Sequence, residues 1–126
     1  MKRTFIAIFM LVFVISFCVA EVIFLNNLIS EFKSDIEITE SFVSNNKIEE
    51  AIKENQKIIH DWKAKHNLIS TFIDHEPLGE IETSFTIMKA SLENDEKEDF
   101  AVESQKALVQ LEQLNSTELP LLGNIL

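Results

Sequence analysis

The sequence contains few of the residues that build turns, strands and disulfides. It has two glycines, two prolines and no tyrosine among 126 residues. This composition disfavours a sheet-rich fold, because hairpin turns need glycine and strands are enriched in aromatic and β-branched residues. Cys18 is the one cysteine, so a disulfide within the chain is excluded. The length suits one domain with a modest core.

Basic side chains are also scarce. Eleven Lys and Arg stand against 21 Asp and Glu, for a net charge of −10. Lys2 and Arg3 are the only charged residues before Glu21. Without those two, nine basic residues face 21 acidic ones, so residues 21–126 carry a charge of −12. Such a surface repels phosphate backbones and anionic head groups, which argues against nucleic-acid binding.

An apolar stretch opens the chain. From Thr4 to Ala20 every residue is apolar except Thr4 and Ser16. In helical form this run spans about 26 Å, the short end for a membrane span. Apolar residues resume from Val22 to Leu25. We therefore expect the lipid bilayer to be the partner of residues 4–25, with a transmembrane anchor at 1–25 and an acidic helical domain at 26–126.

The charges around this stretch predict its orientation. Lys2 and Arg3 precede it and acidic residues dominate after it, so the N-terminus is expected in the cytoplasm and the C-terminal domain outside it. A secreted protein, cleaved from a signal peptide near Ala20, is the alternative. The helical pattern that continues past Ala20, at Val22, Leu25 and Ile29, favours an uncleaved, single-pass cell-membrane protein.

Apolar residues spaced by three and four predict four helices joined by short connections. The spacing of Asn46 and Glu49, and of Asp95 and Glu98, suggests two capping boxes. Short connections predict antiparallel neighbours, and no sequence repeat is visible. The expected fold is all-α: an N-terminal transmembrane helix that continues into an extracytoplasmic antiparallel bundle of about four helices. The expected helix ends lie near residues 42–43, 74–76, 93–95 and 115–117.

Three histidines, His60, His66 and His75, stand near acidic residues and raise the question of a metal site. His60 and His66 are six positions apart, so they point about 120° away from one another on a helix. This spacing argues against a shared ion, and we predict neither a metal nor a cofactor. Trp62 lies in the middle of an apolar stripe and is expected to anchor the core, with a partner contact as the alternative.

The remaining candidate residues point to binding rather than catalysis. No serine stands in a glycine-flanked nucleophile elbow, and the one thiol lies in the apolar stretch. We therefore expect no enzyme and no catalytic residue. The C-terminal tail is more apolar than a free chain end, which suggests that it packs on the bundle or meets a partner. The candidate interaction residues are Trp62, His66, His75, Leu121, Leu122, Ile125 and Leu126.

Several short segments together resemble a known family. They are the apolar N-terminal helix, His60-Asp61-Trp62, Phe72-Ile73-Asp74-His75, Ile81 and the closing Asn124-Ile125-Leu126. This combination resembles the bacterial domain-of-unknown-function family 4363, small membrane-anchored proteins of spore-forming Gram-positive bacteria. The resemblance covers essentially the whole chain. It implies a bacterial cell-membrane location and an uncharacterised role, and it brings no catalytic residue.

Two functions follow as hypotheses, and neither predicts the oligomeric state. The first is a protein-interaction or accessory module that binds another membrane or envelope protein. The alternative is an extracytoplasmic sensor that binds a small ligand in a cavity near Trp62 and acts through a membrane partner.

Overall fold

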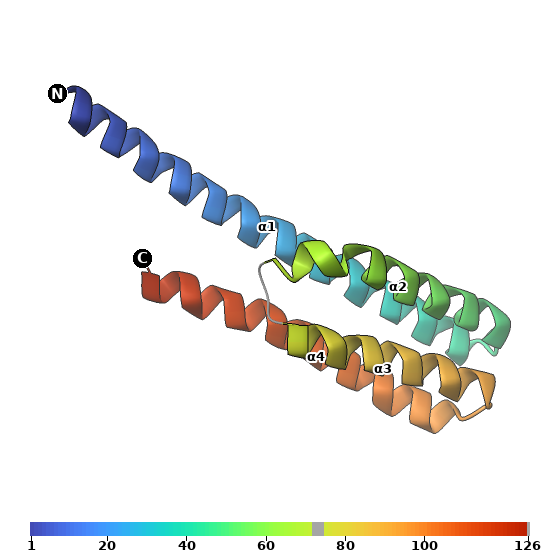
Figure 1. Ribbon diagram of the computed structural model, residues 1–126. Coiled ribbons are helices and arrows are strands. Elements are labelled where there is room, and N and C mark those ends of the chain that lie inside the picture. Colours follow the sequence, from blue (N-terminus) through green and yellow to red (C-terminus); the bar gives the residue numbers. More distant parts are fainter. Residues whose placement is uncertain (72–74, 126) are drawn as a thin grey trace.

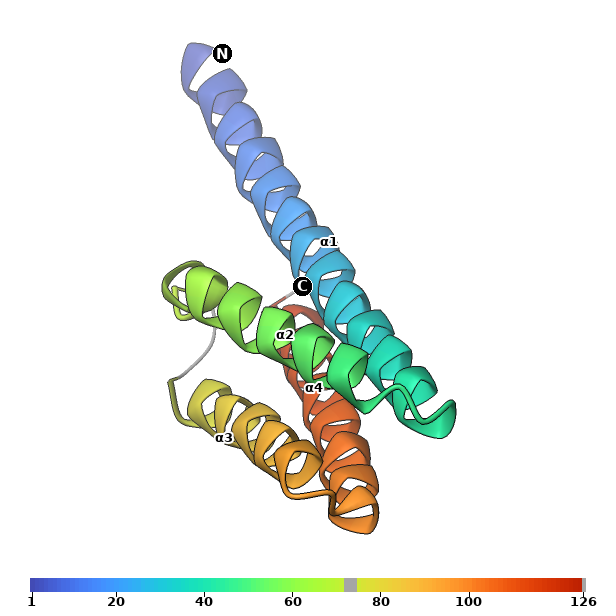
Figure 2. The ribbon, with the colours of Figure 1, turned by 90° about the vertical axis from the view of Figure 1, so that its right-hand side faces the viewer.

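The computed structural model describes residues 1–71 and 75–125, with side chains described over 1–71 and 75–114. It contains α1 (Lys2–Ser44), α2 (Ile48–Ile69), α3 (His75–Glu93) and α4 (Lys97–Ile125), and no strand within the described ranges. The second half of α1 packs with the other helices in a bundle of antiparallel neighbours, and the first half projects alone (Figures 1 and 2). The predicted all-α fold, a long apolar first helix that continues into a helical bundle, is confirmed.

The core is built from one face of each helix. Buried apolar residues recur at spacings of three, four and seven, so each helix turns one stripe toward the bundle axis. Three aromatic rings meet at the centre: Trp62 lies 5.1 Å from Phe32 and 5.5 Å from Phe85 between ring centroids, both edge to face. The other fully buried large side chains include Ile36, Ile58, Ile69, Leu78, Ile81, Met88, Phe100 and Leu111.

The two hairpin turns, between α1 and α2 and between α3 and α4, share one backbone structure. Asn46 and Asp95 adopt the left-handed conformation, with φ of 59° and 58°. The N–H of Lys47 donates to the carbonyl of Phe42, and that of Glu96 to Ser91, each at 2.8 Å. This is the Schellman arrangement that closes helix C-termini.

The predicted capping boxes at Asn46 and Asp95 are therefore both wrong, since each of these residues ends the preceding helix in the left-handed conformation. α2 has Lys47 at its N-cap and no side-chain cap hydrogen bond. The left-handed Asn46 instead ends α1 and reverses the chain. Its Oδ1 accepts a 2.8 Å hydrogen bond from Lys97 Nζ, which ties the two turns together.

The shared turns make the two hairpins structural repeats. Asn46 and Asp95 are 49 positions apart, and buried residues of the first hairpin fall on buried residues of the second at this offset. The residue types differ at most of these positions, which explains why the repeat is not visible in the sequence. Examples are Phe32 and Ile81, Ile36 and Phe85, Ala51 and Phe100, Asn55 and Ser104, and Trp62 and Leu111.

Two helix ends differ from their predicted positions. α2 ends at Ile69 rather than near 74–76; the hydroxyls of Ser70 and Thr71 donate to the carbonyl of Asn67 at 3.0 and 3.2 Å and satisfy one carbonyl of the last turn. α4 continues to Ile125 instead of stopping at 115–117. Passing Asn115, Ser116 and Thr117 costs only tenths of a kcal/mol per residue, because extending a formed helix needs no new nucleation. Pro120 inside the helix costs about 3 kcal/mol, and nothing in the structure explains why α4 continues past it.

Candidate functional site

The first half of α1 leaves its apolar side chains uncovered. Large apolar residues are exposed from Phe5 to Phe24, and the first buried residue is Leu25, at 2% exposure. Within the described part of the chain, α1 is the one helix long and apolar enough to cross a membrane. Its stretch 4–24 is about 32 Å long, close to the roughly 30 Å of a bilayer's hydrocarbon core. This half is a candidate membrane span, although a signal sequence has the same length and composition.

The bundle reaches back to the base of this apolar half. A hollow of about 250 Å³ is lined by Phe17, Ala20, Glu21 and Phe24 of α1 and by Leu68 of α2. Leu68 is 49% exposed although it is a large apolar residue. The end of α2 therefore lies beside the point where the apolar half of α1 leaves the bundle. We call this end of the bundle, near Leu68, the anchor end.

Two of the predicted histidines meet at the anchor end. The rings of His66 on α2 and His75 on α3 stack with centroids 5.5 Å apart and planes 28° apart. His75 Nδ1 lies 3.4 Å from His66 Nε2. His66 is half-buried and its Nδ1 has no hydrogen-bond partner among the described residues, whereas His75 is exposed.

The third histidine, His60, is exposed on α2. The spacing along one helix relates His60 to His66, but the structure brings His66 together with His75. That contact depends on the chain reversal between α2 and α3, which local spacing does not show. Over residues 1–71 and 75–114, no three His, Cys, Asp or Glu side chains form a group able to hold a metal ion.

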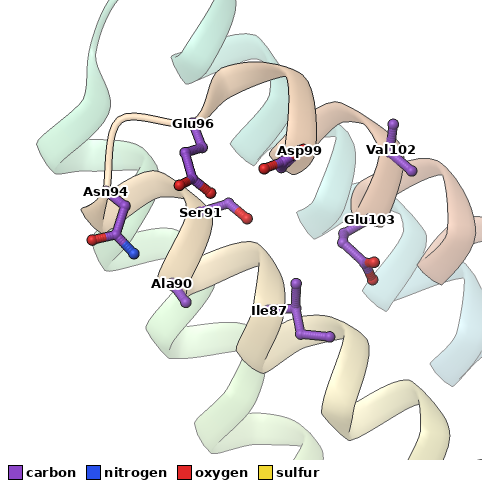
Figure 3. A pocket seen from close by; sticks show the side chains of 8 residues that line it. All are labelled: Ile87, Ala90, Ser91, Asn94, Glu96, Asp99, Val102 and Glu103. Atoms are coloured by element: carbon purple, nitrogen blue, oxygen red, sulfur yellow. The ribbon is translucent and has the colours of Figure 1, made fainter.

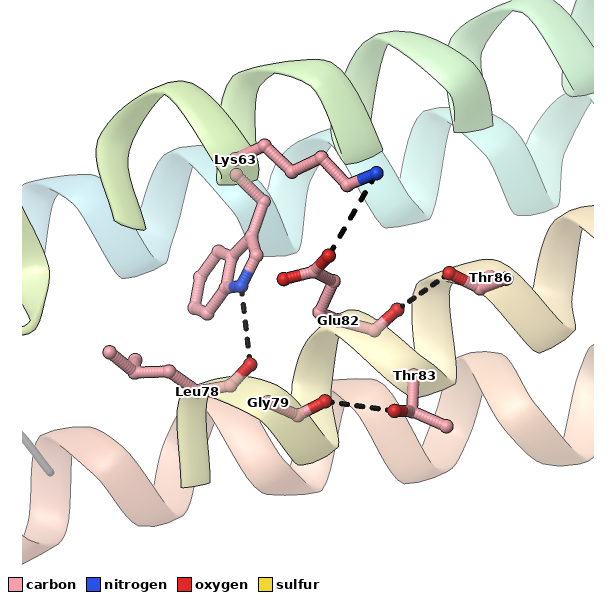
Figure 4. A network of polar contacts seen from close by, with 7 residues as sticks. Lys63, Leu78, Gly79, Glu82, Thr83 and Thr86 are labelled. Atoms are coloured by element: carbon pink, nitrogen blue, oxygen red, sulfur yellow. Dashed lines mark hydrogen bonds and ion pairs between the residues drawn. The ribbon is translucent and has the colours of Figure 1, made fainter. Parts of the chain in front are cut away.

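Trp62 belongs to the core. It is 1% exposed, and its Nε1 donates to the carbonyl of Leu78 at 3.3 Å. Nearby, Asn55 Nδ2 donates to the carbonyl of Phe85 at 2.9 Å. On the surface above them, Lys63 Nζ lies 3.9 Å from a carboxylate oxygen of Glu82 (Figure 4). These contacts join α2 to α3 and leave almost none of the indole accessible.

A groove lies at the opposite end of the bundle, between the end of α3 and the start of α4 (Figure 3). Its volume is about 310 Å³. Ile87 and Val102 present apolar side chains there, 38% and 67% exposed. Sequence reasoning missed this surface, because both residues lie outside the apolar stripes of their helices and the short distance between them depends on how α3 and α4 pack. We call it the α3–α4 groove; it is lined by Ile87, Ala90, Ser91, Asn94, Glu96, Asp99, Val102 and Glu103.

The α3–α4 groove is strongly acidic. A hydrogen bond with Asp99 and the negative charge of that carboxylate raise the pKa of Glu96. Glu103 Oε2 is buried without a hydrogen-bond partner. Carboxylates that crowd in this way favour a positively charged neighbour. The groove therefore suits the contact of a basic and partly apolar surface.

Two further carboxylates lie on the bundle half of α1. Burial raises the pKa of Asp35, against the attraction of Lys57 on α2. Burial also raises the pKa of Glu40, against a hydrogen bond from Gln105 on α4. Both shifts arise from packing inside the bundle, and neither residue lines one of the hollows described above. They are structural features rather than site residues.

The predicted interaction residues of the tail lie at the end of α4. Leu121, Leu122 and Ile125 belong to its last turns, where the side chains lie outside the described part, and Leu126 lies outside the described residues altogether. The backbone of this segment extends past the start of α3, on the side of the bundle from which the apolar half of α1 projects (Figure 1). The tail backbone and the apolar half of α1 thus leave the same end of the bundle.

Comparison with known proteins adds one finding. The family described as Domain of unknown function (DUF4363) matches residues 19–125, which include the whole bundle and the base of the apolar half of α1. No curated protein and no solved structure is significantly similar to the chain.

Proposed function

We propose that this chain, which belongs to the DUF4363 family, is a single-pass membrane protein that holds an acidic helical bundle outside the cytoplasm. One observation carries the proposal: a single unbroken helix, α1, has an exposed apolar first half and a buried second half. Apolar side chains exposed over this length are unfavourable in water, and covering them with lipid or with a partner lowers the free energy of the protein. A bilayer covers all faces of a projecting helix.

The flanking charges support the orientation. Lys2 and Arg3 stand on one side of the apolar half, and the bundle with its excess of acidic residues stands on the other. Basic flanks stay in the cytoplasm during insertion. The continuous helix through Ala20 supports an anchor over a cleaved signal peptide, since no helix end marks that position.

Cysteine labelling in intact cells tests both the span and its direction. Single cysteines replace the exposed Glu37, Glu98 or Lys2 in a Cys18→Ser background, and cells are treated with an impermeant maleimide. We expect labelling at Glu37→Cys and Glu98→Cys, and labelling at Lys2→Cys only after the membrane is opened. Protection of both bundle positions would reverse the orientation. A soluble product that begins near Glu21, by intact mass, would replace the anchor with a signal peptide.

Within this arrangement we propose a protein-interaction or accessory role in the cell envelope. The α3–α4 groove supports it, because Ile87 and Val102 stay exposed beside three carboxylates. The apolar tail is a second candidate contact. In-cell crosslinking should capture a partner through a photoreactive residue at Val102, and capture should fall with Ile87→Asp if the groove is the contact. Deletion of 119–126 tests the tail separately.

The alternative of a ligand sensor built around Trp62 receives less support. The indole is enclosed by Phe32 and Phe85 and hydrogen-bonded to Leu78. It lines none of the hollows described above. A non-enzymatic role also fits two of the buried serines: Ser84 Oγ bonds to the carbonyl of Glu80 and to Gln110 Oε1, and Ser104 Oγ bonds to the carbonyl of Ala101.

A further inference from the structure

We propose that His66 and His75 form a binding site for a divalent transition-metal ion at the anchor end of the bundle. The two imidazoles come from different helices, and His75 Nδ1 and His66 Nε2 face each other at 3.4 Å. The inference rests on this pair of nitrogens and is independent of the membrane topology proposed above.

The separation of the nitrogens fits a shared ion. Zinc binds imidazole nitrogen at about 2.0–2.1 Å with tetrahedral angles, which places two ligand nitrogens about 3.4 Å apart. In the structure the nitrogens point toward each other, so both rings must turn slightly to direct their lone pairs at one ion. His75 is exposed, so its ring can turn without displacing a buried side chain. Water completes the coordination.

The chemistry of the pair selects the class of ion. Neutral imidazole binds Zn²⁺, Cu²⁺ and Ni²⁺, whereas Ca²⁺ and Mg²⁺ take oxygen ligands. The acidic domain, with −12 over residues 21–126, raises the local concentration of any cation. This negative charge does not distinguish zinc from magnesium, so the preference for a transition metal must come from the two histidines.

A missing hydrogen bond to His66 limits the affinity for the ion. A histidine that binds metal through Nε2 carries its proton on Nδ1 and usually donates it to an oxygen. His66 Nδ1 is buried and has no such partner within residues 1–71 and 75–114. We therefore expect binding that is specific for the pair but weaker than at a structural zinc site with four protein ligands.

A bound ion would join the two helical hairpins. His66 lies in the last turn of α2 and His75 is the first residue of α3, so the metal would bridge the connection between them. A ligand that binds only the folded state stabilises it by mass action. The ion would thus oppose separation of α2 from α3 at the anchor end of the bundle.

Zinc titration of the full-length protein tests the site. The protein is purified in detergent without a polyhistidine tag and titrated calorimetrically with Zn²⁺ in the presence of excess Mg²⁺. We expect one Zn²⁺ per chain and a rise in Tm with zinc. His66→Gln and His75→Gln should each lower the affinity by more than the roughly 10- to 100-fold that loss of an outer-shell partner costs. His60→Gln, a matched change at an exposed histidine of α2, should bind like the wild type.

Two results would overturn the proposal. One is the absence of zinc binding to the wild type, which would leave an ordinary hydrogen bond between imidazoles. The other is zinc binding that persists in both variants, which would assign it to surface carboxylates. Circular dichroism without metal checks that each variant folds, and the exposed position of His75 keeps His75→Gln informative if His66→Gln fails to fold.

Discussion

Phe32 of α1 and Trp62 of α2 pack edge to face, with ring centroids 5.1 Å apart and planes at 79°. Trp62 also meets Phe85 of α3 edge to face at 5.5 Å and donates its N–H to the carbonyl of Leu78. One side chain therefore holds three helices together. Aromatic pairs in this geometry add about 0.5–1.5 kcal/mol beyond the burial of their area.

Replacement of Trp62 should be among the most damaging changes in the bundle. Trp62→Ala removes these contacts and leaves a cavity, so we expect a loss of about 3–5 kcal/mol in the free energy of unfolding. Urea unfolding measures this loss. Circular dichroism follows it instead of fluorescence, because Trp62 is the only tryptophan in the chain. Trp62→Phe keeps an aromatic ring but removes the N–H donor, and should cost clearly less. Equal losses in the two variants would contradict the account of Trp62 as a packing anchor.

The left-handed turn at Asp95 predicts a reversal of the usual ranking of alanine and glycine. In a helix interior glycine is less stable than alanine by about 1 kcal/mol. At φ of 58° an alanine side chain is strained by roughly 1–2 kcal/mol and glycine is not. Asp95→Gly should therefore be more stable than Asp95→Ala, and both variants lose the same carboxylate. Thermal unfolding measures the difference.

The exposed Ala101 of α4 is the control for that reversal. Ala101→Gly should lower the free energy of unfolding by about 1 kcal/mol. If glycine were also the less stable residue at position 95, the left-handed turn would not exist in solution.

Much of the fold was predictable because apolar periodicity is a local property of the chain. The long first helix and the breaks near Asn46 and Asp95 follow from spacing and turn residues alone. The repeat of the two hairpins was not predictable, since Ala51 occupies the position that Phe100 has in the second hairpin. Burial is repeated there while residue type is not.

The candidate sites show the same division. The apolar half of α1 was evident from a continuous run of residues. The contact between His66 and His75 was not, because it depends on how the chain returns after α2. The α3–α4 groove was also missed, since Ile87 and Val102 lie outside the apolar stripes of their helices and single exposed apolar residues are common on protein surfaces.

Asp35 predicts a pH dependence of stability. Burial raises its pKa in the folded state above the ordinary value of 3.8. The folded state therefore binds this proton more tightly than the unfolded state does. The free energy of unfolding falls as the pH rises through the folded-state pKa and Asp35 ionises, and this loss vanishes below pH 3.8. Asp35→Asn should raise the free energy of unfolding at pH 7, and the gain should shrink as the pH falls toward 3.8. Urea unfolding between pH 7 and 4 measures this.

Glu37→Gln is the matched control, because Glu37 is an exposed carboxylate on the same helix. Like Asp35→Asn it removes one negative charge, but the carboxylate that it replaces is exposed rather than buried. If both variants gained the same stability at pH 7, the effect would come from the general negative charge of the bundle.

Arginine substitutions in the apolar half of α1 test whether lipid burial holds the protein. The stretch 4–24 contains 14 Leu, Ile, Phe and Val side chains, each worth about 0.3–0.6 kcal/mol on insertion, or roughly 4–8 kcal/mol together. One arginine at the bilayer centre costs about 2.5–3.5 kcal/mol, so Val12→Arg should still be inserted. Val12→Arg with Ile15→Arg places both charges near the middle of the stretch, costs about twice as much and should release most of the chain during an alkaline wash of the membranes. Val102→Arg on the bundle should have no effect. Retention of the double variant at wild-type level would mean that something other than lipid covers this helix.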